Sequence, residues 1–179
     1  MSLSFMATIE ITNLTQWHDP LVQGIIARLC RELRLRKPVR FLFQETWTAI
    51  DEETGEIVAG TESSETTWDG DACQMSNGGW ARVCISTATV FPVVWNINSA
   101  LPGQYLRHVT WFNDPLEMFL YLSGHELRHL WQFEHPKKTK QIRQLLQIDD
   151  EADADFHALR LLSRYRQNSA DFVEREHKQ

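Results

Sequence analysis

The segment GHELRHL, residues 124–130, holds the side chains whose types and spacing most directly suggest chemistry. An α-helix turns about 100° per residue, so His125 and His129 project from one face, one turn apart. Two imidazole nitrogens at this spacing can bind one tetrahedral zinc ion, while Glu126 can reach a water at the metal. Zinc lowers the pKa of that water, and a carboxylate can take its proton during attack on a carbonyl. The pattern HExxH therefore predicts a zinc-dependent hydrolase with Glu126 as the general base.

A third metal ligand is expected, and Glu151 is the favoured candidate. It lies 22 residues after His129, at the start of the segment EADADFHA. This gap allows one helix to end and a second helix to return against it, so that Glu151 would face the metal. Asp155, one turn further along the same face, could accept the free N–H of a zinc-bound histidine.

The combination of HExxH with a downstream ExxAD resembles the gluzincin superfamily of zinc peptidases, in its small soluble and CAAX-processing branches. The resemblance covers residues 114–162. It implies that His125, His129 and Glu151 are zinc ligands, that Glu126 is the base, and that Asp155 supports a ligand.

Two other residues compete with Glu151 as the third ligand. His135 completes the pattern HExxHxxxxxH, which resembles the metzincin ligand set, but Gln132 stands where that family has a glycine, and no methionine follows Met118. Otherwise His135 would complement the dipole at the C-terminal end of its helix. Cys84, in the segment VCIS, resembles the upstream cysteine of peptide deformylases, although a lone cysteine on a strand is more often a small core residue.

Several further residues are candidates for supporting roles. Tyr105, His108 and Tyr121 could each stabilise an oxyanion, and the sequence does not choose among them. His157 could face the cleft or be an ordinary core or surface histidine. The strand segment 81–83 is either an edge that pairs with an extended peptide substrate or an interior strand.

The zinc motif requires a helix, and the sequence predicts one over residues 114–135. Asp114 is suited to the N-cap, Pro115 to the first helical position and Glu117 to the third. The first two turns are apolar nearly all round, which indicates a central, buried helix.

Other elements are expected on both sides of this helix. After a basic link, PKKTK, a second helical stretch is predicted over about residues 141–166, with a break near residues 149–150. Near the N-terminus, Asp19 and Pro20 predict the N-cap and first position of a helix that runs to about Leu35. Alternating or β-rich segments predict strands at 7–12, 39–47, 56–61, 80–87 and 91–95. A hairpin-like turn is expected after residue 50. Residues 62–79 are expected to form a loop, and residues 96–113 an irregular connection.

The composition limits the class of protein. The chain has 179 residues, of which 42% are hydrophobic, and this is typical of a single globular domain. A net charge of −6 argues against a nucleic-acid partner. Three cysteines without a disulfide-like spacing indicate a reducing, cytoplasmic compartment. Neither a signal peptide nor a run of roughly 18 apolar residues is evident, so no membrane association is expected.

Together these observations predict one α+β domain over residues 1–179, with a zincin-like arrangement. A twisted sheet would pack on the central active-site helix, and a C-terminal helix would carry the third ligand. The expected cofactor is Zn²⁺ and the expected partner is a protein or peptide substrate. The alternative is a zinc-stabilised protein-interaction module that retains the metal and has lost catalysis. The sequence indicates no oligomeric state.

Overall fold

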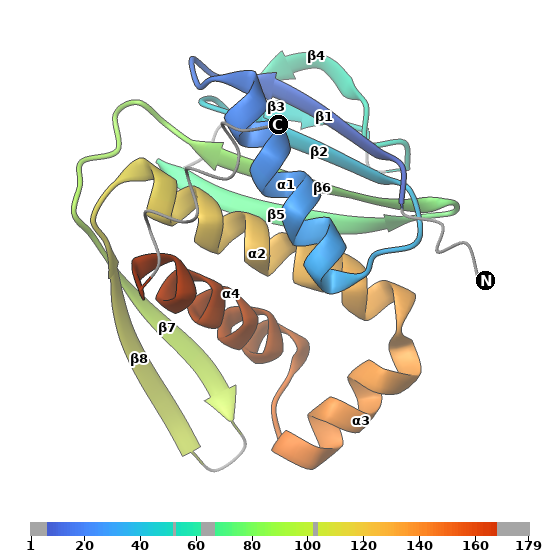
Figure 1. Ribbon diagram of the computed structural model, residues 1–179, viewed down its shortest axis with the longest axis vertical. Coiled ribbons are helices and arrows are strands. Elements are labelled where there is room, and N and C mark those ends of the chain that lie inside the picture. Colours follow the sequence, from blue (N-terminus) through green and yellow to red (C-terminus); the bar gives the residue numbers. More distant parts are fainter. Residues whose placement is uncertain (1–6, 52, 62–66, 102–103, 168–179) are drawn as a thin grey trace.

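The computed structural model describes residues 7–51, 53–61, 67–101 and 104–167, and Figure 1 shows its arrangement. Within these residues the chain forms four helices and eight strands, which confirms the predicted α+β class. In chain order the elements are β1 (Ile9–Leu14), α1 (Asp19–Leu33), β2 (Val39–Gln44), β3 (Thr48–Ile50), β4 (Ile57–Thr61), β5 (Trp68–Met75), β6 (Gly78–Ile85), β7 (Val93–Leu101), β8 (Gln104–Phe112), α2 (Pro115–Glu134), α3 (Pro136–Leu146) and α4 (Asp150–Gln167).

The main sheet has four strands in the order β1-β2-β6-β5. Strands β1, β2 and β6 are parallel, whereas β5 pairs antiparallel with β6. The two central strands, β2 and β6, are buried along nearly their whole length. Among the described strands, β1 and β5 form the edges, and β5 is the edge that contacts α2 (Figure 1).

The two faces of the sheet differ because successive side chains of a strand point in opposite directions. Phe41, Phe43, Ala81 and Val83 belong to the same apolar core as buried residues of α1 and α2. The intervening residues of β2 and β6 face the hairpin formed by β3 and β4. The helices therefore cover one face of the sheet and the small hairpin covers the other.

The structure corrects two expectations about the strands and decides a third point that the sequence left open. Residues 68–75, expected within a loop, form β5, which is polar because an edge strand keeps side chains partly exposed. The segment 39–47 does not pair with 56–61; β4 pairs with the short strand β3 instead. Segment 81–83 lies in β6, which is paired on both sides, so it is not an edge.

The prediction of an irregular connection over residues 96–113 is also wrong. Strands β7 and β8 form a long antiparallel hairpin, with Pro102 and Gly103, which lie outside the described residues, between them in sequence. Val94 and Trp111 are opposite each other in this hairpin and are 64% and 53% exposed. Exposure on one side explains why the sequence carries little of the apolar pattern of a buried strand.

The central helix α2 begins where its sequence predicts. The Asp114 side chain accepts a hydrogen bond from the Glu117 backbone N–H at 2.9 Å, and Pro115 occupies the first turn. Helix α1 differs slightly from expectation, because His18 is its N-cap and it ends at Leu33. No helix among the described residues combines the length and apolar character that crossing a membrane requires.

The region after α2 contains two helices with different boundaries from those expected. The basic segment 136–140 is the start of α3 rather than a link. The left-handed conformation of Gln147 ends α3, and the Asp149 side chain accepts a hydrogen bond from the Ala152 N–H at the start of α4. The predicted break near residues 149–150 is therefore present, and it allows α4 to return along α2.

Helices α2 and α4 approach closely at Gly124. A Cβ added at this position would lie 2.8 Å from a Leu161 methyl carbon and 3.7 Å from Ala158 Cα. Two charged contacts fix the same pair of helices. Arg166 of α4 donates hydrogen bonds to the buried Glu117, and Arg128 of α2 donates to both carboxylate oxygens of Asp153.

We expect Gly124→Val to lower the free energy of unfolding by about 1–3 kcal/mol, the usual cost of overpacking a core. The added branch would meet the fully buried Leu161. Chemical denaturation can measure the change, with Leu161→Ala and the double variant completing a cycle. The two effects should be non-additive by roughly 0.5–3 kcal/mol, because one removes the atoms that the other meets. Strict additivity would show that this contact does not set the helix spacing.

Candidate metal centre

Three potential metal ligands converge where α2 meets the start of α4. His125 Nε2 and His129 Nε2 are 3.0 Å apart. Oxygens of the Glu151 carboxylate lie 3.3 Å from the first nitrogen and 3.4 Å from the second. Among the described residues this is the group of histidine, cysteine and acidic side chains arranged to hold a metal ion. The residues that the sequence favoured as ligands therefore lie together.

The dimensions of this group fit a small tetrahedral ion. Zinc binds histidine nitrogen and carboxylate oxygen at about 2.0–2.2 Å, so two ligand atoms of a tetrahedron are separated by about 3.3 Å. The distances in the His125, His129 and Glu151 group are 3.0–3.4 Å. Two imidazoles and one carboxylate form a donor set that zinc accepts, leaving a fourth position for water or substrate.

Electrostatic interactions link the three side chains. Burial lowers the pKa of His125, but contacts with Asp155 and Glu151 outweigh it and raise this pKa to about 10. Hydrogen bonds from the two histidines hold the pKa of Glu151 well below its ordinary value. A metal ion that binds these nitrogens must displace any proton on them, so metal affinity should fall as the pH is lowered.

Asp155 supports the first histidine. Its Oδ1 lies 2.9 Å from His125 Nδ1, although the N–H direction is poorly aligned for a hydrogen bond. The same oxygen accepts a hydrogen bond of 2.7 Å from the hydroxyl of Tyr121, which is only 2% exposed. Asp155 therefore occupies the position that the sequence suggested, and the Tyr121 hydroxyl, a candidate oxyanion donor, is directed to this carboxylate.

Gln132 supports the second histidine, a role that the sequence analysis missed. Its Nε2 donates to the Asp150 carbonyl and to Asp153 Oδ2, at 2.8 and 2.9 Å. The amide oxygen must then face His129 Nδ1, which lies 2.8 Å away, so this nitrogen carries the proton and Nε2 is free to bind a metal. Its position three residues after His129, one turn along the same face, could have indicated the role.

Glu126 lies beside the cluster without belonging to it. The residue is 5% exposed, and burial raises the pKa of its carboxyl to about 7, partly offset by the two histidines. Gly70 of β5 approaches so closely that an added Cβ would lie 2.6 Å from Glu126 Oε1. The sequence suggested a loop at Asp69-Gly70; in the structure the edge strand passes over the carboxylate, and a side chain at Gly70 would have to displace that of Glu126.

A cavity of about 510 Å³ opens over these groups. Residues 68–70 of β5 form one wall, while Glu151 and Asp155 of α4 form the opposite wall. Trp95 of β7 and Tyr121 of α2 contribute aromatic surface. The Glu151 side chain is 71% exposed, whereas the two histidines are 14% and 12% exposed, so the cluster is open to solvent from the side of α4.

The competing ligand candidates lie elsewhere. His135 ends α2, with its ring stacked on Trp131 at 4.7 Å and its Nδ1 3.0 Å from the Trp131 carbonyl oxygen. Cys84 is buried in β6, and burial raises the pKa of its thiol to about 11. Neither belongs to the ligand group found among the described residues.

Two other candidates can be placed only in part. His157 is absent from the lining of the cavity, and burial together with Arg128 and Arg164 lowers its pKa to about 4. Tyr105 and His108 belong to β8, but their side chains lie outside the described part of the structure.

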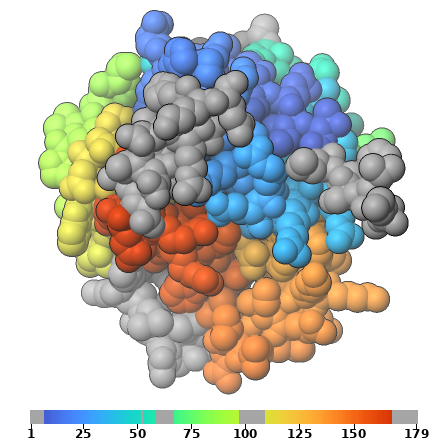
Figure 2. All heavy atoms as spheres, viewed as in Figure 1, coloured from blue at the N-terminus to red at the C-terminus, as the bar shows by residue number. Residues whose placement is uncertain are grey.

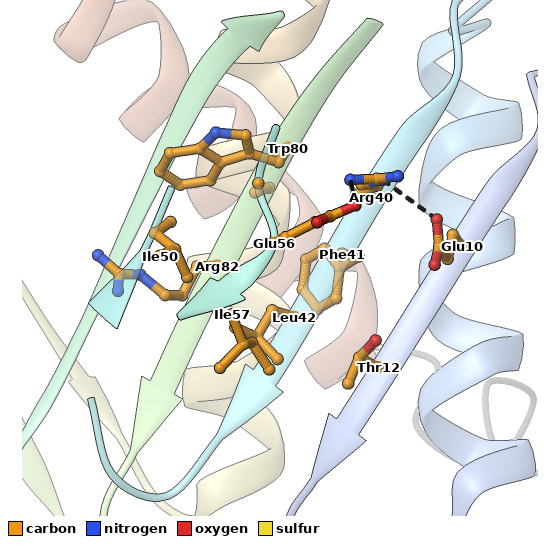
Figure 3. Close-up of a pocket in the computed structure, with 12 residues that line it drawn as sticks. Glu10, Thr12, Arg40, Phe41, Leu42, Ile50, Glu56, Ile57, Trp80 and Arg82 are labelled. Atoms are coloured by element: carbon orange, nitrogen blue, oxygen red, sulfur yellow. Dashed lines mark hydrogen bonds and ion pairs between the residues drawn. The ribbon is translucent and has the colours of Figure 1, made fainter. Parts of the chain in front are cut away.

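A second cavity, of about 200 Å³, lies on the opposite face of the sheet beneath β3 and β4 (Figure 3). Its main cation, Arg40, is paired with Glu10 and Glu56 at 3.2 and 3.5 Å. No histidine or cysteine lines it. The catalytic chemistry suggested by the sequence therefore belongs to the cavity at α2 and α4.

No protein-family model, curated protein or solved structure matches this chain. A functional interpretation therefore depends on the side chains of the cluster and on their surroundings.

We expect Glu151→Ala to weaken binding of added Zn²⁺ by more than about 100-fold, which exceeds the usual loss when only a supporting residue is removed. His135→Ala is the matched control and should leave the affinity nearly unchanged, because His135 lies outside the cluster. Competition with a chromophoric chelator measures both constants. The opposite ranking would assign the third ligand to His135.

Gln132→Met should reduce Zn²⁺ affinity by about 10–100-fold, because His129 would lose the acceptor that orients its ring. The exposed Gln141 of α3 provides the control, since Gln141→Met makes the same chemical change away from the cluster. The same chelator competition applies, and circular dichroism checks that both variants fold. Equal affinities for the two variants would remove Gln132 from the metal centre.

Proposed function

We propose that this chain is a zinc-dependent metallopeptidase, in which His125, His129 and Glu151 hold the ion and Glu126 is the general base. The observation that carries the proposal is the convergence of two imidazole nitrogens and one carboxylate beside a buried Glu126. The resemblance of HExxH and ExxAD to gluzincins supports the same assignment. The helix-borne ligands and the antiparallel edge strand along α2 are consistent with a zincin-like arrangement.

Zinc is the ion that we infer, because two imidazoles and one carboxylate match a common catalytic zinc site. The ion supplies Lewis acidity, which polarises a carbonyl and makes water nucleophilic near neutral pH. Structural zinc sites are usually closed by four protein ligands, whereas this group provides three and is open at the largely exposed Glu151. These features favour catalysis over the alternative of a purely structural zinc module.

Glu126 is suited to move a proton near neutral pH. A general base works best when its pKa lies near the operating pH, and burial brings the Glu126 pKa to about 7. A cation at the neighbouring cluster would favour the ionised carboxylate, which is the form that accepts a proton. The approach of Gly70 leaves room for the carboxylate at the cavity wall and for no side chain above it.

A peptide bond is the inferred substrate because the cavity is bordered by an edge strand. Among the described strands, β5 pairs only with β6, so its other side can offer backbone N–H and C=O groups to an extended peptide. Residues 68–70 of this strand line the same cavity as Glu126. A polypeptide added along β5 would therefore pass over the proposed metal centre with its backbone held by hydrogen bonds.

We expect purified protein with about one bound Zn²⁺ per chain to cleave peptides in a mass-spectrometric library assay, with cleavage abolished by a chelator. Glu126→Gln should retain the zinc but lower the cleavage rate by roughly 10²–10⁴-fold, because an amide cannot take the proton. Glu53→Gln, at an exposed turn between β3 and β4, is the matched control.

Unchanged cleavage in Glu126→Gln would contradict the assigned base. Protein that neither contains zinc nor binds added Zn²⁺ would contradict the metal centre. Capture of an intact partner with equal affinity by wild-type and Glu126→Gln protein, without cleavage, would favour the interaction module instead.

A further inference from the structure

A third cavity lies in line with the proposed active site, at the other end of β5. It has a volume of about 880 Å³ and is lined by Gln74 of β5, by Gln132 and Phe133 of α2, and by one face of α3. Gly70 lies over Glu126, whereas Gln74 lies near Phe133, so β5 follows α2 over this distance. Glu126 and Phe133 are seven residues apart in α2, which corresponds to about 10 Å along the helix axis. The proposed metal centre belongs to the first cavity, and Gln132, which contacts His129, lines the third.

The third cavity is basic on the side formed by α3. This helix carries Lys137, Lys138, Lys140 and Arg143 and no acidic residue, although the whole chain has a net charge of −6. Lys140 and Arg143 line the cavity. Figure 2 shows α3, in orange, as an exposed part of the surface at the lower edge of the molecule.

These two cations remain available to a ligand. Lys140 has no ion pair with a carboxylate among the described residues. Arg143 contacts Asp150 at 3.3 Å, but the two side chains are 52% and 41% exposed, and ion pairs in such positions are weak. An acidic ligand could therefore compete for Arg143 with little loss.

The cavity over the metal centre has the opposite character. Trp68 and Trp95 meet there with their ring centroids 4.7 Å apart, beside Tyr121 and Leu122. Four acidic residues, Asp69, Glu126, Glu151 and Asp155, line the same cavity. Even with the two positive charges of Zn²⁺, these four carboxylates would leave this end net negative, so an acidic substrate side chain would favour the end formed by α3. An aromatic side chain would find apolar surface at the two tryptophans.

We propose that the substrate is an extended polypeptide that places a large apolar or aromatic side chain against Trp68 and Trp95 and an acidic side chain against Lys140 and Arg143. This inference rests on the proposed peptidase function. The part of β5 between Trp68 and Gln74 spans about 20 Å, so roughly six residues of substrate separate the two contacts. The opposite character of the two ends fixes the direction in which the chain enters the cleft.

Binding to zinc-loaded Glu126→Gln protein tests the proposal without turnover. Three pools of dye-labelled dodecapeptides share one Phe in a randomised neutral background. They differ in a cluster of three Glu, three Gln or three Lys residues that begins about six positions from the Phe. Each pool is made in both chain directions. Fluorescence anisotropy measures the dissociation constants at low and high salt.

We expect the Glu pool to bind about 10-fold more tightly than the Lys pool in one chain direction, which corresponds to about 1.4 kcal/mol. Added salt should reduce this preference because the contacts are exposed. Lys140→Glu, the cavity variant, should abolish or reverse it. Lys138→Glu is the matched control, because Lys138 lies about 200° around the helix from Lys140 and should preserve the preference within about twofold. Trp68→Leu should weaken binding of all three pools.

Equal binding of the three pools, or no binding of any, would overturn the proposal. An equal effect of Lys138→Glu and of the cavity variant would also overturn it, since the preference would then reflect overall charge. Chelator-sensitive cleavage by wild-type protein without an acidic preference would contradict this inference alone. An acidic preference without any cleavage would contradict the peptidase function and leave the two-ended binding cleft in place.

Discussion

The close contact between α2 and α4 is the constraint on which the rest of the candidate site depends. The metal-binding group is divided between these helices, because two histidines belong to α2 and Glu151 belongs to α4. Gly124 and Ala158 let the helices approach to a distance that a larger side chain at Gly124 would prevent. At this spacing the ligand atoms of the two helices lie within 3.0–3.4 Å of one another. The packing of α2 against α4 therefore also sets the geometry of the metal site. This accounts for a glycine in the interior of a long helix, despite its cost to helix stability.

Burying polar groups along this contact requires that they satisfy one another. Arg128, Asp153 and Gln132 form a continuous set of hydrogen bonds that reaches His129, and Asp155 with Tyr121 forms a shorter set at the other histidine. A buried charge or amide without partners would be costly, so each of these residues depends on the position of the next. The same contacts that offset the cost of burial also orient the imidazole rings toward the centre of the cluster. Stability and pre-organisation of the site thus come from one network.

The edge strand β5 connects this centre to the surface of the protein. A strand at an edge has unpaired backbone groups, which natural proteins usually shield with charged residues, short length or covering loops. Here one end of the strand borders an aromatic and acidic cavity, and the other end borders the basic face of α3. Helix α3 contributes little to the core, since Thr139 is its buried residue, so its basic composition is free of packing constraints. The basic face of α3 is therefore consistent with a role in binding an acidic polypeptide rather than in stabilising the fold.

The sequence by itself determined the α+β class, the start of α2 at Asp114 and the HExxH group, because these depend on local capping and on the periodicity of one helix. The resemblance to gluzincins, together with the departures from the metzincin pattern, favoured Glu151 over His135. Only the tertiary structure places the Glu151 carboxylate against the histidines, since that requires α4 to return along α2. The polar edge strand β5 escaped the sequence analysis, as did the hairpin of β7 and β8 apart from the strand predicted at 91–95. Exposed strands lack the apolar alternation that identifies buried ones. The role of Gln132 likewise depends on partners 18 and 21 residues away in the chain. Local patterns specify which side chains can do chemistry, whereas the packing of distant segments decides which of them meet.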